Sequence, residues 1–397
     1  MAENLEKKAP NVRFKGFTDV WEQRKLGEVL EEKNIRLGNG DLLSVTLGKG
    51  VVKASELDRK DNSSSDKSKY KMVEKKDIVY NTMRMWQGAL GISKYSGIVS
   101  PAYTVLSSKN KFDPHFISIL FKQSKMIYLF GAYSQGLTSD TWTLKYNSLS
   151  KIVAKFPSFD EQVKIYSIFD RLNTLITLYQ RKIGLLQQLK KAMLQRLFPD
   201  TDTYPKLRFD GFSDPWEQHK LGEVTTSYSG GTPKAGEEKY YSGNIPFIRS
   251  AEINSSTTEL FISELGLNSS SAKLVSKGMI LYALYGATSG EVGISKIDGA
   301  INQAILALTP VEKYDSIFIS QYLKLIKGKI VQKYLQGGQG NLSASIVKNI
   351  DIKFPDCDEQ LKISQFLTKF DTLITLQQHK LDNMHELKKF MLQNLFL

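Results

Sequence analysis

The sequence predicts an α+β (mixed α/β) protein built as an internal repeat, with two globular domains and two long antiparallel helices that form a coiled coil. The first observation behind this prediction is a long stretch at residues 156–198 that returns at residues 354–397, with roughly half of the aligned positions identical. The second is a short leader at residues 12–29 that returns at residues 207–224. The third is that the two intervals between leader and long stretch have similar lengths, at residues 30–155 and 225–353.

Each long stretch is predicted to be one helix, because its apolar residues recur mostly at steps of three and four. Ser158 precedes Glu161 by three residues, and Asp356 precedes Glu359 by the same spacing, which predicts a capping box at each helix start. Pro157 and the equivalent Pro355 stand just before the helix, where a proline costs no helical hydrogen bond. We assign the adjacent carboxylates at these starts to capping and to the helix dipole, rather than to a metal site.

A helix of about forty residues at ~1.5 Å per residue is a rod of roughly 60 Å, and its apolar stripe needs a partner. The other copy is the simplest partner; the alternative is that the two helices are core elements of unrelated domains. The residues expected to form the coiled coil and to dock other subunits are Phe169, Leu172, Ile176, Ile183, Leu186, Phe370, Leu373, Leu381, Met384 and Leu387.

The two intervals look unrelated, but a constant shift of 202 residues aligns shared features, such as Gly88 with Gly290 and Gly97 with Gly299. Both are therefore expected to share one mixed fold with different surface residues. Strands are expected at residues 78–80, 103–106, 279–284 and 304–308, and helices at residues 114–130 and 316–335. Polar, glycine-containing loops follow these helices at residues 133–140 and 336–343.

These observations divide the chain into six consecutive segments. They are an N-terminal tail with the first leader (1–29), a first variable domain (30–155), a first long helix (156–200), a linker with the second leader (201–224), a second variable domain (225–353) and a second long helix (354–397). Antiparallel pairing of the helices would relate the two halves by a pseudo-two-fold axis. It would also place the first leader beside the end of the second helix, near Leu395, so that the chain is quasi-circular.

Composition favours a globular protein with a polyanionic partner. The chain has 397 residues with 41% hydrophobic and 24% charged residues, and its formal net charge is +13. The positive excess falls mainly in residues 30–155. A single cysteine, Cys357, excludes internal disulfides, and the absence of a long apolar run or a signal peptide favours a cytoplasmic location. Basicity alone also fits a merely solvated basic surface.

This layout resembles the specificity subunit of type I restriction-modification enzymes, a resemblance that covers essentially the whole chain after residue 10. It is carried by the Phe-Pro and Asp-Glu-Gln start of each long helix, by the repeated leader with Trp-Glu-Gln, and by Gly-Gly-Thr-Pro at residues 230–233. Residues 285–290 (Tyr-Gly-Ala-Thr-Ser-Gly) and 302–304 (Asn-Gln-Ala) are also similar to that family's target-recognition domains. The first domain departs from the pattern, since it lacks the Gly-Gly-Thr-Pro and has Met-Trp-Gln-Gly at residues 85–88.

The resemblance implies a non-catalytic, sequence-specific DNA-binding subunit of a host-defence complex for DNA methylation and restriction. Each target-recognition domain would read one half of a bipartite asymmetric site, and the helices would set the gap and dock partners. The implied partners are double-stranded DNA, two modification (methyltransferase) subunits and two restriction (motor and nuclease) subunits. The resemblance implies no cofactor in this chain; S-adenosylmethionine, ATP and Mg²⁺ would belong to the partner subunits of an adenine-N6 methyltransferase and ATP-dependent endonuclease.

The residues are consistent with this lack of catalytic chemistry. No GxxxxGK[ST] phosphate loop, no GxGxxG after a strand and no Asn-Pro-Pro-aromatic tetrapeptide occurs in the sequence. None of the four histidines, His115, His219, His379 and His385, has metal-ligand spacing, and no metal site is predicted. The alternative to a DNA-specificity subunit is a non-DNA scaffold with duplicated recognition domains on a coiled-coil stalk.

Phosphate contacts are expected from lysines, and base contacts from polar side chains on loops that can enter a groove. Arg84 and Arg249 stand out because arginine can bind guanine with two hydrogen bonds, although a structural salt bridge is the alternative for each. In the first domain the candidates are Lys49, Lys53, Lys67, Lys69, Lys71, Arg84, Trp86, Gln87, Tyr133 and Gln135. In the second they are Thr232, Lys234, Lys239, Arg249, Lys273, Thr288, Ser289, Gln339 and Asn341.

Overall fold

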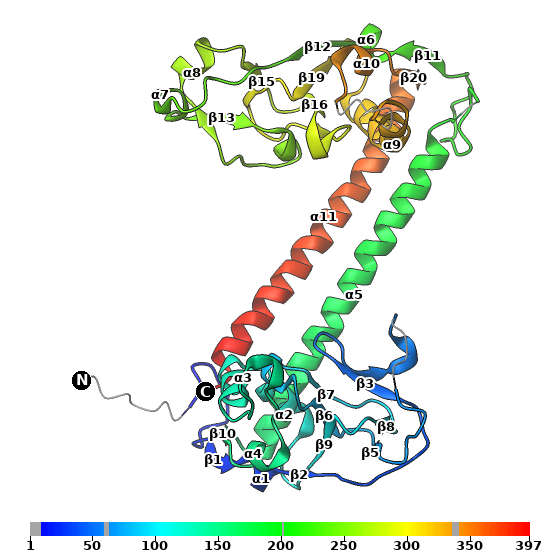
Figure 1. The fold of residues 1–397 in the computed structure, drawn as a ribbon. Helices are drawn as coiled ribbons and strands as arrows, with labels where there is room; N and C mark the ends of the chain where they lie inside the picture. Colours follow the sequence, from blue (N-terminus) through cyan, green and yellow to red (C-terminus); the bar gives the residue numbers. More distant parts are fainter. Residues whose placement is uncertain (1–8, 59–62, 201, 336–340) are drawn as a thin grey trace. The chain divides into compact units, whose positions relative to one another are not determined.

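The computed structural model describes residues 9–58, 63–200, 202–335 and 341–397 (Figure 1). The chain forms two compact units. Unit 1 comprises Met1–Gln180 together with Lys380–Leu397, and unit 2 comprises Arg181–His379. Each unit therefore combines one leader, one variable domain and parts of both long helices. No helix of the described residues is long and apolar enough to cross a membrane.

Unit 1 is organised around a four-stranded antiparallel sheet, and its apolar core lies between this sheet, the neighbouring helices and the end of the chain. The sheet order is β2 (Leu30–Glu32), β9 (Tyr103–Ser108), β6 (Ile78–Asn81) and β7 (Leu90–Ile92). Three strand pairs complete the unit: β3 (Leu43–Thr46) with β4 (Gly50–Lys53), β5 (Lys71–Val73) with β8 (Gly97–Val99), and β1 (Glu22–Lys25) with β10 (Val153–Phe156). The helices are α1 (Leu26–Val29), α2 (Pro114–Phe121), α3 (Ser124–Ala132) and α4 (Tyr146–Leu149), with short 3-10 turns η1 (Ala54–Glu56), η2 (Met85–Gln87) and η3 (Ser139–Thr141).

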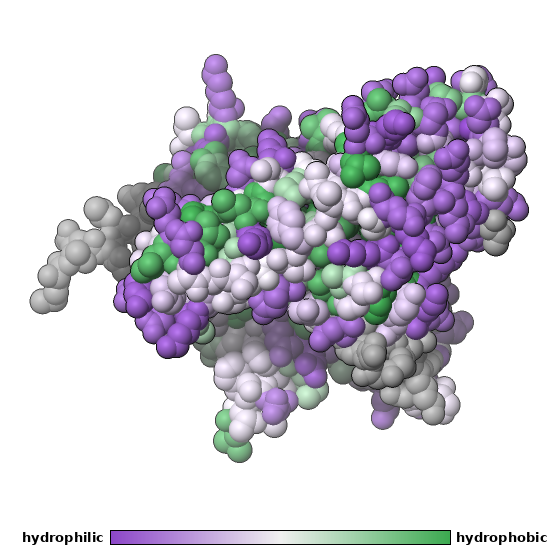
Figure 2. Space-filling view, turned by 90° about the horizontal axis from the view of Figure 1, so that it is seen from above, coloured by the Kyte–Doolittle hydropathy of each residue, from purple (hydrophilic) through white to green (hydrophobic). Residues whose placement is uncertain are grey.

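Unit 2 repeats the four-stranded sheet in the order β12 (Thr225–Ser229), β19 (Ile305–Pro310), β16 (Ile280–Ala283) and β17 (Val292–Ile294). A second four-stranded sheet has the order β14 (Phe261–Ile262), β13 (Ile245–Ile248), β18 (Gly299–Ile301) and β15 (Lys273–Val275), and β11 (Glu217–Lys220) pairs with β20 (Asp351–Phe354). The helices are α6 (Leu221–Val224), α7 (Glu238–Tyr241), α8 (Glu264–Asn268), α9 (Ser316–Leu335) and α10 (Ala344–Lys348), with 3-10 turns η4 (Ser250–Glu252) and η5 (Gly286–Thr288). Figure 2 shows the hydrophobic surface residues in separate patches among hydrophilic ones.

The 202-residue shift inferred from sequence is confirmed by strand register. Ile78 pairs with Leu106 in unit 1, and Ile280 pairs with Leu308 in unit 2, so both residues of the pair move by the same number. The four predicted strands are confirmed as β6, β9, β16 and β19 within one or two residues at their ends. The shared fold follows because the same consecutive apolar residues of these strands, such as 78–80 and 280–282, are buried in both units.

One predicted helix is wrong. Residues 114–130 form two helices, α2 and α3, whereas the matching residues 316–335 form the single helix α9. The chain breaks at Gln123, whose backbone is extended at ψ 143° and whose side chain donates to the Ile119 carbonyl oxygen at 3.2 Å. Leu325 occupies the equivalent position in α9 and packs against the core of unit 2, which favours a continuous helix there.

The two long helices are confirmed as α5 (Phe159–Leu197) and α11 (Cys357–Asn394). In unit 1 the Phe169 ring lies 6.1 Å from that of Phe396, and Lys388 Nζ donates to Asn173 Oδ1 at 2.7 Å. In unit 2 Lys190 Nζ forms a 2.6 Å ion pair with Asp371 Oδ1. In unit 1, α11 numbering falls as α5 numbering rises, so the pairing is antiparallel. Of the ten expected coiled-coil residues, Leu373 and Leu387 are exposed, Leu186, Phe370 and Met384 are half-buried, and Phe169, Leu172, Ile176, Ile183 and Leu381 are buried.

The predicted capping boxes form only in part. The Glu161 N–H donates to Ser158 Oγ at 3.4 Å and the Glu359 N–H to Asp356 Oδ1 at 2.9 Å, which confirms the caps. Neither glutamate carboxylate returns to the cap, however. Arg13 donates Nε and Nη2 to the two oxygens of Glu161 at 2.8 and 2.7 Å, and Arg208 binds Glu359 in the same way at 2.9 and 2.8 Å. We call these two bidentate pairs the leader clamps. They prevail because both glutamates are fully buried, and a buried charge needs a partner of opposite charge.

The glutamine that follows each glutamate ties the helix start to the variable domain. The Gln162 amide donates to the Pro157 carbonyl oxygen at 2.9 Å, and its Oε1 accepts from the Asp113 N–H at 2.9 Å. Gln360 repeats both bonds, to Pro355 at 2.9 Å and from Asp315 at 3.1 Å. The Asp-Glu-Gln motif thus has one residue for the leader and one for the domain, which explains its recurrence within the chain.

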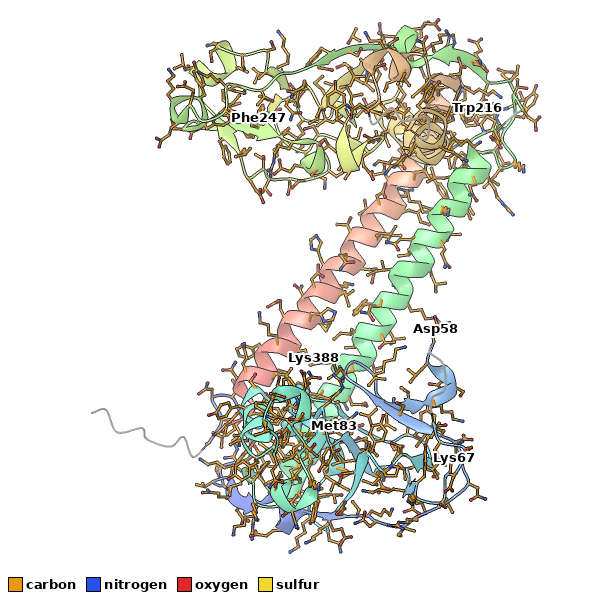
Figure 3. The ribbon with its side chains drawn as sticks, in the orientation of Figure 1. Asp58, Lys67, Met83, Trp216, Phe247 and Lys388 are labelled. Carbon is orange, nitrogen blue, oxygen red and sulfur yellow. The ribbon has the colours of Figure 1, made fainter. Side chains whose placement is uncertain are left out.

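Each leader also meets the end of a long helix. The Val12 N–H donates to the Asn394 carbonyl oxygen at 3.0 Å in unit 1, and the Leu207 N–H donates to that of Arg196 at 2.9 Å in unit 2. The buried Trp21 ring contacts Phe396 in unit 1, and Trp216, seen in Figure 3, contacts Phe198 in unit 2. The expected proximity of the first leader to the end of the second helix is therefore confirmed.

Candidate nucleic-acid interface

Each unit has a surface that we call the tip. It is formed by the turn that follows β6 in unit 1 or β16 in unit 2, together with the loop that follows α3 or α9. In unit 1 the Leu144 N–H donates to the Thr82 carbonyl oxygen, and in unit 2 the Leu342 N–H donates to that of Leu284, both at 2.9 Å. These bonds bring together the turn and the loop in which the sequence analysis predicted base-contacting residues. The tips are the strongest candidates for groove-reading loops, because a rigid sheet positions them.

The unit 1 tip gathers Arg84, Trp86 and Gln87 on and beside η2 with the loop of Tyr133 and Gln135. The Trp86 ring packs edge-on against Trp142 with centroids 5.5 Å apart, and its Nε1 donates to the Met83 carbonyl oxygen at 3.1 Å. Arg84 and Gln87 are exposed, and Arg84 Nη1 donates to Gln87 Oε1 at 3.3 Å. Among the described residues, no carboxylate pairs with Arg84. Its guanidinium is therefore available to a guanine edge or a phosphate.

The unit 2 tip carries different chemistry on a related turn, in which η5 begins one residue earlier than the 202-residue shift of η2 would place it. Gly88 and Gly290 close the two turns with φ of 83° and 81°, a conformation that favours glycine. Thr288 is half-buried, Asn341 is exposed and pairs with Tyr285 in an isolated bridge, and Ser289 is buried with its Oγ donating to the Leu284 carbonyl oxygen at 3.2 Å. Ser289 thus supports the turn in this structure. Gln339 lies outside the described residues.

The remaining candidates of unit 1 lie away from its tip. Lys49 is exposed in the turn between β3 and β4, and Lys69 is exposed just before β5. Lys53 and Lys67 line one cleft of about 700 Å³, where Lys53 forms a 2.7 Å ion pair with Asp41. Lys71 pairs with Glu32 at 3.4 Å. The structure therefore brings the aromatic and amide candidates together and leaves the lysines on neighbouring strands.

In unit 2 the other candidates are held by their own neighbours. The exposed Thr232 donates to Gln303 Oε1 at 2.8 Å, which joins the Gly-Gly-Thr-Pro and Asn-Gln-Ala motifs. Lys234 and Lys239 both pair with Glu237, and Lys273 is exposed on β15. Arg249 binds Glu252 at 2.9 Å and Glu259 at 2.6 Å, so the salt-bridge alternative for this arginine is present. Hydrogen bonds from Arg249 lower the pKa of Glu252 to about 2. A base contact by Arg249 would require both ion pairs to break.

Sequence reasoning missed two sets of residues. The leader clamps were missed because Arg13 and Arg208 are ordinary leader residues whose partners lie about 150 positions away; their recurrence at matching places in both leaders was the available signal. The second set is a stripe of exposed apolar residues, which we call the outer stripe, and of its members only Leu373 and Leu387 were expected from the sequence, as coiled-coil and docking residues. Its members recur at a spacing of 198 residues as Val163 and Leu361, Leu175 and Leu373, Leu178 and Leu376, and Leu189 and Leu387.

The charge distribution also differs between the two domains. Residues 30–155 contain 20 Lys and Arg against 11 Asp and Glu, whereas residues 225–353 contain 13 against 10. Among the residues that the structure describes, no group of three or more His, Cys, Asp and Glu could hold a metal ion. Polar tips, together with the excess of basic residues in unit 1, are typical of nucleic-acid recognition.

Comparison with known proteins places this geometry in a family. Residues 18–189 and 213–385 each match the family described as type I restriction modification DNA specificity domain. These two matches cover most of the chain, and the chain belongs to this family, with two copies of its domain.

Similar proteins match most of the chain's length. The putative type I restriction enzyme MjaX specificity subunit of Methanocaldococcus jannaschii is 22% identical, over 93% of this chain and 91% of that protein. The MjaVIII specificity subunit of the same organism is 24% identical over 81% of this chain and 80% of its own length. The crystal structure of the type I restriction-modification S subunit from M. genitalium superposes with a TM-score of 0.64 at 15% identity, covering 98% of this chain and 99% of that one, which supports the fold.

Proposed function

We propose that this protein is the DNA-specificity subunit of a type I restriction-modification system, in which each unit reads one half of a bipartite, asymmetric DNA site. The observation that carries the proposal is that one scaffold holds two different tips. Leader clamp, glutamine tie and sheet register are the same in both units, whereas Arg84, Trp86 and Gln87 of unit 1 align with Gly286, Thr288 and Ser289 of unit 2. Tips that differ on a shared scaffold are what two different half-sites require, and here the turn backbone differs too, with φ of −130° at Arg84 and 75° at Gly286.

The outer stripe supports a second part of the proposal, that two modification subunits dock on the long helices. Four apolar pairs remain about half exposed at equivalent places of α5 and α11, although burying the rest of each side chain would contribute about 1 kcal/mol. Equivalent surfaces on the two helices favour two identical partners. Catalysis, with S-adenosylmethionine, ATP and Mg²⁺, would reside on the partner subunits, including two restriction subunits in the full complex.

The experiment that tests recognition is co-expression of the chain with a candidate modification subunit, followed by mapping of methylated adenines across the host genome. We expect one split sequence with two unlike halves and a fixed gap. Insertion of four residues, about one helical turn, within residues 185–193 should change the gap and leave both halves unchanged. Methylation without a split sequence, or none with an active modification subunit, contradicts the proposal and favours the scaffold alternative.

Docking is tested by Leu178→Glu and Leu376→Glu, made separately and together. Each single variant should lose one modification subunit, and the double variant both, as read from the mass of the intact complex. Gln180→Glu is the matched control, because it adds the same charge on another, exposed face of α5. Equal losses for Gln180→Glu would show that charge alone, and not the outer stripe, decides assembly.

A further inference from the structure

Unit 1 contains a cleft of about 810 Å³ where α2 and α3 approach both long helices; we call it the lysine cleft. Lys122, Lys125, Lys388 and Lys389 line it, and Asp170 is the only acidic side chain among its lining residues. Figure 3 shows Lys388 on α11 near the end of that helix. Four ammonium groups in one concavity repel one another, so the cleft is a place where an anion would be stabilised.

Two of these lysines, the exposed Lys122 and the half-buried Lys388, form no ion pair with a carboxylate among the described residues. Lys388 Nζ donates to the neutral Asn173 Oδ1 at 2.7 Å. Burial, with a further contribution from the charge of Lys388, lowers the pKa of the Lys122 ammonium. Asp170 acts instead on Tyr166, whose pKa it helps to raise, and on His115, which stacks on Tyr166 with ring centroids 4.3 Å apart.

Unit 2 has the same four lysines at the equivalent positions, as Lys324, Lys327, Lys190 and Lys191, but it supplies counter-charges for two of them. Asp371 replaces Asn173, and it accepts from Lys190 at 2.6 Å and from Gln321 at 3.0 Å. Glu291 replaces Ala89 and pairs with Lys327. Lys190 and Lys327 of unit 2 are therefore paired with carboxylates, whereas their counterparts Lys388 and Lys125 of unit 1 form no ion pair among the described residues.

We infer that the lysine cleft of unit 1 binds phosphate groups of the DNA backbone, and that its counterpart in unit 2 does not. The inference rests on the proposed function, because that function supplies the DNA. It adds the place on unit 1 where the duplex backbone is bound independently of base sequence. Lysine is a compact charge suited to phosphate, and such contacts fix position and not base identity. Because only unit 1 would bind phosphate in this way, the two units would make unequal numbers of phosphate contacts.

The test exchanges the residue that distinguishes the clefts. Asn173→Asp gives unit 1 the carboxylate of unit 2, and Asp371→Asn does the reverse; neither changes side-chain size, and each copies a residue that the other unit accommodates. The measurement is binding of the full chain to a fluorescent 40-base-pair duplex over a range of salt concentrations. Asn173→Asp should flatten the plot of log affinity against log salt by about 0.9 for each phosphate that the cleft no longer neutralises. At 0.15 M salt the Kd should rise at least threefold. Asp371→Asn should not flatten the plot.

Lys388→Gln, with Lys190→Gln as its counterpart in unit 2, repeats the test by removing the charge itself. Each of three results would overturn the inference. The first is an equal salt slope of duplex binding for all variants, and the second is binding of inorganic tripolyphosphate with no change of that slope in the variants. The third is loss of the slope difference between unit 1 and unit 2 variants when a modification subunit occupies the cleft. The methylated sequence separates this inference from the proposed function. Asn173→Asp should leave that sequence unchanged, whereas a chain that directs no methylation but keeps the slope difference would refute only the proposed function.

Discussion

The two units share a scaffold, and they differ in the side chains of their tips and in which charged side chains are paired. Leader clamps, glutamine ties and the buried tryptophans recur at the same places in both. Among the described residues, Arg84 of unit 1 has no carboxylate partner, whereas the prominent arginine of unit 2, Arg249, is held by two glutamates. The cleft lysines show the same contrast, because Lys190 and Lys327 of unit 2 have carboxylate partners and their counterparts Lys388 and Lys125 of unit 1 have none among the described residues. Duplication thus preserved the contacts that define the fold and released the surface to diverge, most strongly in the charge available to a ligand.

The largest expected effect comes from replacing residues 30–155 with the matching domain of a relative. If the tips read independently, one half of the methylated site should change completely while the other half and the gap persist. Genome-wide mapping of methylated adenines measures this directly. The reciprocal replacement of residues 225–353 is the control and should change the opposite half. A change of both halves by either replacement would show that the units do not read separately.

The leader clamps should be equivalent in strength if the scaffold is truly duplicated. Arg13→Met and Arg208→Met each leave a buried glutamate without its partner, and each should destabilise its own unit by about 3–5 kcal/mol. Hydrogen exchange of the β6 and β16 amides would report the two units separately. Because Arg13 is bound to the buried Glu161 and Arg24 only to the exposed Glu22 and Glu28, Arg24→Met is the control and should have a far smaller effect. A clear difference between the two clamps would argue against equivalent halves.

Acid should weaken unit 2 more than unit 1 through Glu252, whose counterpart in unit 1 is Gly50. The pKa of Glu252 is lowered from 4.5 to about 2 in the folded protein, chiefly by hydrogen bonds from Arg249. A lowered folded pKa contributes stability above pH 4.5, and this stability is lost as the pH falls toward 2.

Glu252→Gln should therefore destabilise unit 2 by about 1–2 kcal/mol at pH 6, after allowance for solvent screening, and have much less effect near pH 2.5. Urea unfolding at the two pH values, followed by unit 2 amides, measures the difference. Glu264→Gln, which changes an exposed glutamate of the same unit, should show no such dependence. A loss of equal size at both pH values would mean that the carboxylate charge is not what stabilises this loop.

The smallest effect distinguishes two buried tyrosines that occupy the same place. Tyr80 Oη donates to the Leu144 carbonyl oxygen at 3.1 Å, whereas the buried Tyr282 hydroxyl has no hydrogen-bond partner among the described residues. Tyr80→Phe should cost about 1 kcal/mol, and Tyr282→Phe should be neutral or slightly stabilising. Exchange of the strand amides in each unit gives both values, and equal costs would show that Tyr282 finds a partner in solution.

Sequence reasoning reached the architecture because a repeat is compared with itself. The 202-residue shift, the four strands and the two long helices all follow from periodicity and identity within one chain, and the structure agrees with them. The failures are local. The break at Gln123 and the glutamates that leave their capping boxes depend on a buried or distant neighbour, which local spacing does not encode. The base-contact residues remain predictions, although the structure gathers Arg84, Trp86, Gln87, Tyr133 and Gln135 at one tip.

The sequence by itself determined the duplicated order of leader, domain and helix, since apolar periodicity and repeated motifs are properties of consecutive residues. Only the tertiary structure decided how each charge is used. A charged residue caps a helix, forms a leader clamp, joins an ion pair or stays unpaired according to which distant residue lies beside it. Asn173 and Asp371 differ by one functional group at equivalent positions of two related helices. Their consequence for Lys388 and Lys190 becomes visible only when the antiparallel partner is in place.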